Sequence, residues 1–234
     1  RRQDIFDNNA PNFVGHMSLG MSPALQDMIK DADLVLSVGS RLGDIPTGGY
    51  ALIEPPRARQ TLILSHVDAA ELGRVFQADL AIQASPDAMA SALSTLVPHA
   101  VPRWGEWTKR GRAAFEAFTA RKVHGEPVAG VDLTEVMLHL NKALPADAVL
   151  ANGAGNYSVW LHRYYRYRAP RTELASTCGA MGYGLPAAIA AALRLKGRTV
   201  VCVAGDGCFL MYPQELATAV QYGASLIVLV VNNG

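Results

Sequence analysis

The sequence predicts an α/β protein built from two doubly wound parallel-sheet domains. Short apolar runs rich in Val, Ile and Leu alternate with segments whose apolar residues repeat at helical spacing. Several of these runs end in clusters of Gly, Asp or Asn, as expected where a parallel strand turns toward a helix. Half of the 234 residues are apolar, which is enough to bury substantial cores.

The first predicted domain covers residues 1–98 and resembles an open parallel sheet with helices between its strands. Residues 1–20 are rich in Asn, Pro and Gly and predict mostly loop. Ser22 before Pro23 predicts a helix start, and Ser85 before Pro86 predicts another that runs to about Leu96. A buried strand is expected at residues 33–39 and further strands at 60–68 and 79–84, with a short helix at 69–74.

Residues 99–130 predict a linker, because Pro and Gly gather at both of its ends. Between them, residues 104–123 form a charged helical pattern. We interpret this pattern as a solvated connector helix in preference to a binding element.

The second predicted domain covers residues 131–234. Asp132 and Glu135 form a pattern like a capping box, ahead of a helix with one apolar face. Strands are expected at 148–152 and 172–176, and helices at about 157–164 and from Pro186 to Leu195. The basic and aromatic run at 162–168 favours an exposed helix end over an RNA-binding surface, given a net charge of +1.

Residues 201–234 predict a strand, a helix from Tyr212 to Tyr222 and a second strand, each strand ending in a polar cluster. The first ends in Gly205-Asp206-Gly207 and the second in Asn232-Asn233. The carboxyl ends of parallel strands share one edge of a sheet, where such folds bind ligands. Asp206 and Asn233 offer hard oxygen donors of the kind that Mg²⁺ takes beside a phosphate.

This pair of motifs and its spacing resemble the signature of thiamine diphosphate-dependent enzymes. The resemblance implies that Asp206 and Asn233 hold Mg²⁺ against the diphosphate of thiamine diphosphate. A third ligand would come from position 235, beyond this sequence. Backbone groups of two turns would hold the diphosphate end of the cofactor, and they include Ala154, Gly155, Asn156, Tyr157, Gly205, Gly207, Cys208 and Phe209.

The glycine-rich turn at 177–186 resembles the segment of this family that holds the aminopyrimidine ring. The resemblance implies two catalytic positions. The Gly179 carbonyl would accept from the amino group of the ring, and the Met181 side chain would lie under the cofactor and bend it. The expected reaction is attack by the cofactor on a small 2-oxo acid, with decarboxylation, carboligation or both.

Residues 181–188 and motifs in the first half are similar to the acetolactate synthase-like branch of the family. The first domain therefore resembles that branch's central domain, a dinucleotide-type fold. Two departures are visible: Ile45 stands where the branch has an Arg for its second oxo acid, and Asn156-Tyr157 replaces a Gln-His pair. FAD, which that branch carries, stays an open alternative cofactor. The family also implies a homo-oligomer, a dimer or tetramer.

Composition excludes several classes of protein. The near-neutral charge gives no field for nucleic acid or acidic membranes, and no apolar run is long enough to span a bilayer. Cys178, Cys202 and Cys208 lack zinc or disulfide spacing and favour a reducing, cytoplasmic setting.

The chain starts without Met and stops at the end of a strand. We therefore expect an internal piece of a longer polypeptide, incomplete in both domains. We also expect this piece to be inactive by itself, because the family's pyrimidine-binding domain and its Glu are missing.

Two further functions remain open from sequence. One is a nucleotide- or CoA-binding module without chemistry, although Gly153-Ala154-Gly155 only begins a dinucleotide fingerprint. The other is a regulatory subunit that keeps the fold without catalysis.

Overall fold

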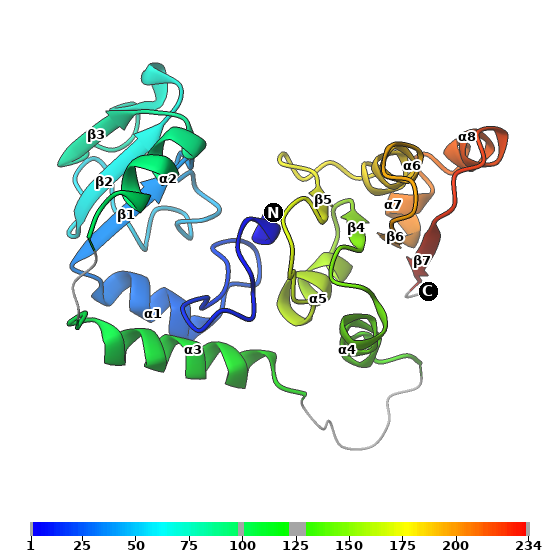
Figure 1. The fold of residues 1–234 in the computed structure, drawn as a ribbon, viewed down its shortest axis with the longest axis horizontal. Coiled ribbons are helices and arrows are strands. Elements are labelled where there is room, and N and C mark those ends of the chain that lie inside the picture. The colour runs from blue at the N-terminus through cyan, green and yellow to red at the C-terminus, as the bar shows by residue number, and fades with distance from the viewer. Residues whose placement is uncertain (1, 98–100, 122–129, 233–234) are drawn as a thin grey trace. The chain divides into compact units, whose positions relative to one another are not determined.

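A computed structural model describes residues 2–97, 101–121 and 130–232 (Figure 1). The chain divides into two compact units. One comprises Val14–Phe118, and the other joins Arg1–Phe13 to Thr119–Gly234. Each unit contains one parallel sheet, of three strands and of four strands. The predicted α/β class with two parallel sheets is confirmed.

The unit of residues 14–118 is built on a sheet with strand order β1-β2-β3. Its strands are β1 (Leu34–Val38), β2 (Thr61–His66) and β3 (Leu80–Gln83). Its helices are α1 (Pro23–Asp31), a 3₁₀ helix (Ala69–Glu71), α2 (Pro86–Ser94) and α3 (Gly105–Thr119). The predicted helix starts are confirmed, since Ser22 Oγ accepts from Leu25 N–H at 3.1 Å and Ser85 Oγ from Ala88 N–H at 3.2 Å.

The core of this unit lies on one face of the sheet. Leu62 and Leu64 of β2 pack there with Ile53 and Phe76. The expectation of a fully buried first strand is wrong, because Leu34, Leu36 and Val38 are exposed. β1 is an edge strand among the described residues, and these three side chains share the face opposite the core.

The interpretation of α3 as a solvated connector is wrong over its described length. A Cβ on Gly111 would overlap Met28 of α1 and Val14, so the two helices pack closely (Figure 1). Phe115 of α3 is also buried. The end of the predicted helix, residues 122 and 123, lies outside the described residues, as do linker residues 99, 100 and 124–129.

The second unit is built on a sheet with strand order β5-β4-β6-β7. Its strands are β4 (Val149–Asn152), β5 (Glu173–Ala175), β6 (Val200–Gly205) and β7 (Ile227–Val231). Its helices are a 3₁₀ turn (Gln3–Ile5), α4 (Leu133–Ala143), α5 (Tyr157–Tyr164), α6 (Gly184–Arg194), α7 (Asp206–Phe209) and α8 (Glu215–Gln221).

Helices cover both faces of this sheet, as the doubly wound prediction requires. Leu150, Val201 and Val203 face α4 and α5, where Met137 and Leu161 complete one core. The alternate strand residues face α6 and α8 in a second core. The side-chain alternation of β4 and β6 therefore separates two apolar layers.

The start of α4 differs in detail from a capping box. Asp132 Oδ1 accepts from Thr134 N–H at 2.8 Å, which confirms the cap. Glu135 instead forms an ion pair with Arg121. The reciprocal bond of a capping box is replaced by this pair.

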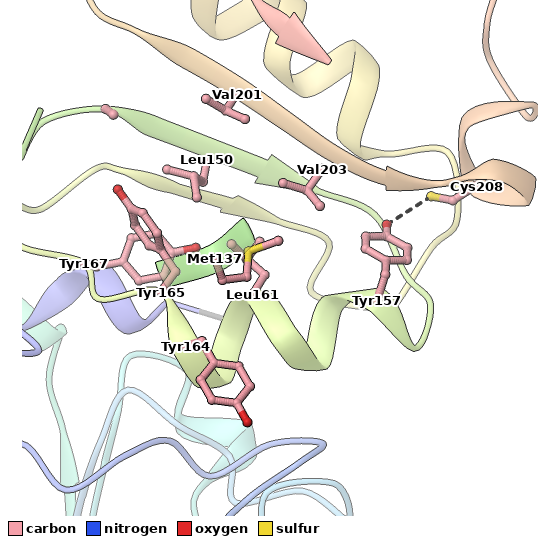
Figure 2. Packing of buried hydrophobic residues seen from close by; sticks show 11 residues of the cluster. Met137, Leu150, Tyr157, Leu161, Tyr164, Tyr165, Tyr167, Val201, Val203 and Cys208 are labelled. Carbon is pink, nitrogen blue, oxygen red and sulfur yellow. Dashed lines mark hydrogen bonds between the residues drawn. The ribbon is translucent and has the colours of Figure 1, made fainter. Parts of the chain in front are cut away.

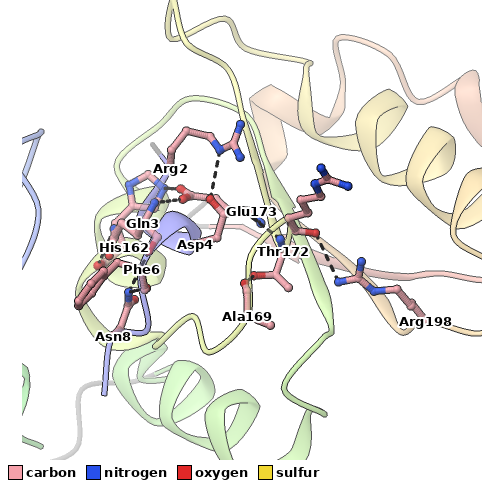
Figure 3. A network of polar contacts seen from close by, with 11 residues as sticks. Arg2, Gln3, Asp4, Phe6, Asn8, His162, Ala169, Thr172, Glu173 and Arg198 are labelled. Carbon is pink, nitrogen blue, oxygen red and sulfur yellow. Dashed lines mark hydrogen bonds and ion pairs between the residues drawn. The ribbon is translucent and has the colours of Figure 1, made fainter. Parts of the chain in front are cut away.

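The N-terminal segment is bound to β5 by buried polar contacts (Figure 3). Asp4 Oδ2 accepts from the N–H groups of Thr172 and Glu173, at 3.0 and 3.2 Å. Glu173 Oε2 in turn accepts from Gln3 N–H at 2.5 Å. Further along, Asn8 N–H donates to Tyr167 O, and Asn8 Oδ1 accepts from Tyr167 N–H. These contacts place residues 3–8 in the second unit although they precede the first in sequence.

The basic and aromatic run at 162–168 is not the exposed helix end that we expected. His162, Tyr164, Tyr165 and Tyr167 are all buried. Tyr165 and Tyr167 pack edge to face, with ring centroids 5.1 Å apart. The chain leaves α5 after Tyr164, and Tyr165 and Tyr167 join the apolar cluster that contains Met137 and Leu150.

Over the described part of the chain, no helix has the length and apolar character needed to cross a membrane.

Candidate functional site

The four-stranded sheet has a topological switch point between β4 and β6. The chain leaves β4 for α5 on one face and leaves β6 for α8 on the other. Asn152 of β4 pairs with Val203 of β6, so the turns that follow them lie at the same edge. Open α/β sheets bind ligands at such a point, where the two turns diverge.

The turn after β6 carries the predicted acidic residue. Gly205 ends the strand, and Asp206 follows at once as the first residue of α7. Asp206 is half-buried, Gly207 is exposed and Cys208 is buried. Phe209 packs partly into the core beside α6. Within residues 205–209, Gly207 is thus the only exposed residue, and Asp206 beside it is partly accessible.

The turn after β4 closely approaches the β6 turn. Gly155 has a φ of +157° and leaves no room for a side chain, since a Cβ would lie 2.7 Å from the Tyr157 ring. A Cβ on Gly205 would lie 3.0 Å from the same ring. Asn156 is exposed and makes no capping bond to α5, while Ala154 is half-buried. The two turns thus pack against the same tyrosine ring.

The turn before α6 completes the group. Ser176 Oγ accepts from Ala180 N–H at 2.9 Å and shapes its start. Gly179 and Gly182 have φ values of +74° and +80°. Met181 is 43% exposed, and its methyl group would lie 3.7 Å from a Cβ on Gly207. The structure therefore brings Met181 against the Asp206 turn, although the two are separated by 25 positions.

The buried thiol of Cys208 contacts all three turns, and Figure 2 shows its contact with Tyr157. Tyr157 Oη donates to Cys208 Sγ at 3.4 Å, and Gly182 N–H donates to the same sulfur at 3.2 Å. A Cβ on Gly153 would overlap that sulfur. Burial is the main reason that the pKa of Tyr157 is raised far above its usual value, so its hydroxyl stays protonated and donates. Burial similarly raises the pKa of the Cys202 thiol to about 12.

The predicted metal pair is only half visible. Gly205 pairs with Val231 in the parallel ladder, so Asp206 and Asn232 both begin beyond neighbouring strand ends. Asn233 lies outside the described residues. Among the residues with described positions, no group of three or more His, Cys, Asp or Glu is placed to hold a metal. A site here would depend on Asp206 together with amide and carbonyl oxygens.

Sequence reasoning missed one polar residue at this edge. Asn152 is the last residue of β4 and is almost fully buried. Its Nδ2 donates to the Gly153 carbonyl, but Oδ1 has no hydrogen-bond partner among the described residues. An unpaired buried acceptor is costly, which is consistent with a donor group supplied by a ligand or water. A polar residue ending a buried strand was the available signal.

The residues at this edge fit a diphosphate. A Cβ on Gly153, Gly155 or Gly205 would meet the Cys208 sulfur or the Tyr157 ring, so only glycine lets the backbone of these turns pack this closely. Asp206 supplies one hard, half-buried oxygen donor beside them. The remaining predicted cofactor contacts stay predictions.

Family models match most of the chain. Residues 1–93 match the thiamine pyrophosphate enzyme central domain, and residues 153–234 match the thiamine pyrophosphate enzyme C-terminal TPP binding domain. All three turns lie within the second match.

Curated relatives are acetolactate synthases. The large subunit from Parasynechococcus marenigrum (strain WH8102) is 30% identical over 97% of this chain and 36% of its own length. Acetolactate synthase 2, chloroplastic, from Zea mays is 33% identical over 88% of the chain and 32% of its own length. The isozyme 2 large subunit from Escherichia coli (strain K12) is 27% identical over 95% and 39%. The chain thus spans about a third of the length of the relatives it matches.

Proposed function

The chain belongs to the thiamine pyrophosphate enzymes, and from this premise we propose that it forms the diphosphate-binding part of an enzyme acting on a 2-oxo acid. The observation that carries the proposal is the meeting of three glycine turns and Asp206 at the switch point of the second sheet. Domain models and relatives support the same assignment.

In this proposal the turns after β4 and β6 hold the diphosphate. Ala154, Gly155, Asn156 and Tyr157 contribute from the first turn. Gly205, Gly207, Cys208 and Phe209 contribute from the second. Asp206 and Asn233 hold Mg²⁺, which neutralises the diphosphate charge. The close approach permitted by Gly155 and Gly205 supports this arrangement.

The turn before α6 would hold the rest of the cofactor. The Gly179 carbonyl accepts from the amino group of the aminopyrimidine, and Met181 supports the cofactor from below. The exposed position of Met181 beside Gly207 supports its role, because a core methionine would be buried. When bound, thiamine diphosphate supplies the carbanion chemistry that cleaves or forms bonds next to the 2-oxo acid carbonyl. The chain's own residues orient the cofactor and balance its charge.

The reaction class is a lyase or transferase reaction like that of acetolactate synthases. Decarboxylation fits the chain as well as carboligation does, because Ile45 replaces the basic residue that would favour a second oxo acid. FAD remains an alternative second cofactor of the first unit. We also propose a homo-oligomer, a dimer or tetramer, and a cytoplasmic setting.

Calorimetric titration with thiamine diphosphate in the presence of Mg²⁺ tests the proposal. We expect saturable binding that is lost when Mg²⁺ is chelated. Asp206→Ala should weaken it at least about tenfold, or about 1.4 kcal/mol. Asp147→Asn is the matched control, because this exposed carboxylate lies in the same unit and pairs only with Arg198 among the contacts described. Affinity unchanged by Asp206→Ala, or heat with CoA or ADP in place of thiamine diphosphate, would contradict it.

A further inference from the structure

The strongest feature that the proposed function leaves unused is the buried contact between Tyr157 and Cys208. Tyr157 opens α5 on one face of the sheet, and Cys208 lies in α7 after β6. Both side chains are less than a tenth exposed. Their 3.4 Å contact spans two elements that are 51 positions apart in sequence.

Each partner also makes a contact that the other does not. Cys208 Sγ accepts from Gly182 N–H and lies against Gly153. The Tyr157 ring packs against both Gly155 and Gly205. Through these contacts the pair touches all three turns of the candidate site.

Resting on the proposed function, we propose that Tyr157 and Cys208 form a positioning pair that fixes the spacing of the three cofactor-binding turns. Neither side chain needs to touch the diphosphate for this role. The ring sets how closely the Gly155 and Gly205 turns approach each other. The sulfur holds the Gly182 turn, and with it Met181, against the Asp206 turn.

The physical reason is preorganisation. A diphosphate that is bound by backbone N–H groups from separate turns binds more tightly when those turns already have the correct spacing. If binding must first order the turns, the free energy of that ordering lowers the affinity. Glycine turns do not provide such rigidity by themselves, because glycine is the least restricted residue. A buried hydrogen-bonded pair beneath them provides it.

A double-mutant cycle tests the pair. Tyr157→Phe removes only the hydroxyl, and Cys208→Ala removes the sulfur. We expect each to weaken Mg²⁺-dependent thiamine diphosphate binding about fivefold to tenfold. The double variant should be hardly weaker than either single variant, because the shared contact is lost only once. Cys208→Ser keeps an acceptor and should recover affinity to within about twofold of the natural chain.

Tyr164→Phe is the matched control, since this buried tyrosine lies at the opposite end of α5 (Figure 2). It should leave cofactor affinity unchanged. Urea unfolding of all variants without cofactor gives a second measurement. Tyr157→Phe and Cys208→Ala should also be coupled in their free energies of unfolding.

The outcomes separate the two proposals. Additive losses of affinity, or losses equal to those of Tyr164→Phe, overturn the positioning pair while the proposed function stands. Absence of thiamine diphosphate binding by the natural chain overturns both. Coupling in unfolding without coupling in affinity shows a purely structural contact and also overturns the positioning role.

Discussion

Gly182 and Gly197 share a left-handed backbone but differ in their surroundings. Their φ values are +80° and +87°. A Cβ on Gly182 would lie 2.5 Å from the Tyr212 ring, whereas nothing lies within 4 Å of one on Gly197. We expect Gly197→Ala to cost about 1–2 kcal/mol of unfolding free energy, the strain of the conformation alone.

Gly182→Ala should cost more than Gly197→Ala, because the ring must also move. Urea unfolding of the two variants measures the difference directly. Equal losses would show that Tyr212 moves aside freely and that the turn before α6 is less tightly packed than its contacts indicate.

Glu173 is a buried carboxyl whose charge opposes folding. Its side chain is fully buried, and burial raises its pKa above 4.5. The Asp4 carboxylate raises this pKa further, whereas the hydrogen bond from Gln3 N–H lowers it. A raised carboxyl pKa means that the folded chain binds the proton more tightly than the unfolded chain. This contribution to stability is complete below pH 4.5 and is lost as the pH rises through the raised pKa.

Glu173→Gln should remove this loss of stability at rising pH, and the Gln side chain keeps an acceptor for Gln3 N–H. Each unit of pKa elevation corresponds to about 1.4 kcal/mol. Unfolding free energies measured from pH 4 to 8 should therefore fall less for Glu173→Gln than for the natural chain. The exposed Asp147→Asn variant should retain the natural slope.

At the scale of elements, residues 3–8 are hydrogen-bonded to β5 and to the segment before it. Asn8 N–H donates to the Tyr167 carbonyl, and Asn8 Oδ1 accepts from Tyr167 N–H. Its Nδ2 also donates to the carbonyls of Gln3 and Phe6 at 2.9 and 2.8 Å. Asn8→Ala leaves the buried Tyr167 N–H without its acceptor, Asn8 Oδ1. We expect a loss of about 1–3 kcal/mol in unfolding free energy.

Asn9→Ala is the neighbouring control for the Asn8 contacts, since Asn9 is exposed and, among the described residues, only its backbone N–H is bonded, to Asp7 Oδ1. A loss for Asn8→Ala no larger than for Asn9→Ala would show that water replaces the lost acceptor.

The sequence predicted the local parts of these elements and missed the long-range ones. Ser22 and Ser85 each accept a hydrogen bond from the N–H group three residues later, so a short stretch of sequence contains the whole interaction. The bond from Asn8 to Tyr167 joins residues 159 positions apart, and no periodicity records it. Tyr165 and Tyr167 were misplaced for a related reason, because alternating Arg and Tyr resembles a surface until packing decides otherwise.

The candidate site shows the same division. Asp206 was placed from its strand and glycines, which are local features. The contact of Cys208 with Tyr157 and Gly182 was not foreseen, because a cysteine carries no directional pattern in sequence. The predicted domain boundaries, 1–98, 99–130 and 131–234, stay predictions beside the two compact units.

At the scale of the whole molecule, each unit has its own core, so we expect two unfolding transitions by calorimetry. Leu64→Ala should lower only the transition of the unit of residues 14–118. Leu150→Ala should lower only the other. Each change empties a buried site and should cost about 2–5 kcal/mol within its own unit.

The N-terminal residues provide a further test of which unit each unfolding transition belongs to. Asp4 lies ten positions before the first unit, yet its carboxylate accepts from Thr172 and Glu173 in the second. Asp4→Ala should therefore lower the same transition as Leu150→Ala and leave that of Leu64→Ala unchanged. Thiamine diphosphate with Mg²⁺, at a hundred times the dissociation constant, should stabilise only the unit that contains Leu150. The unfolding free energy of that unit should rise by about 2.7 kcal/mol. A single transition shifted equally by all three substitutions would show that the two cores unfold as one.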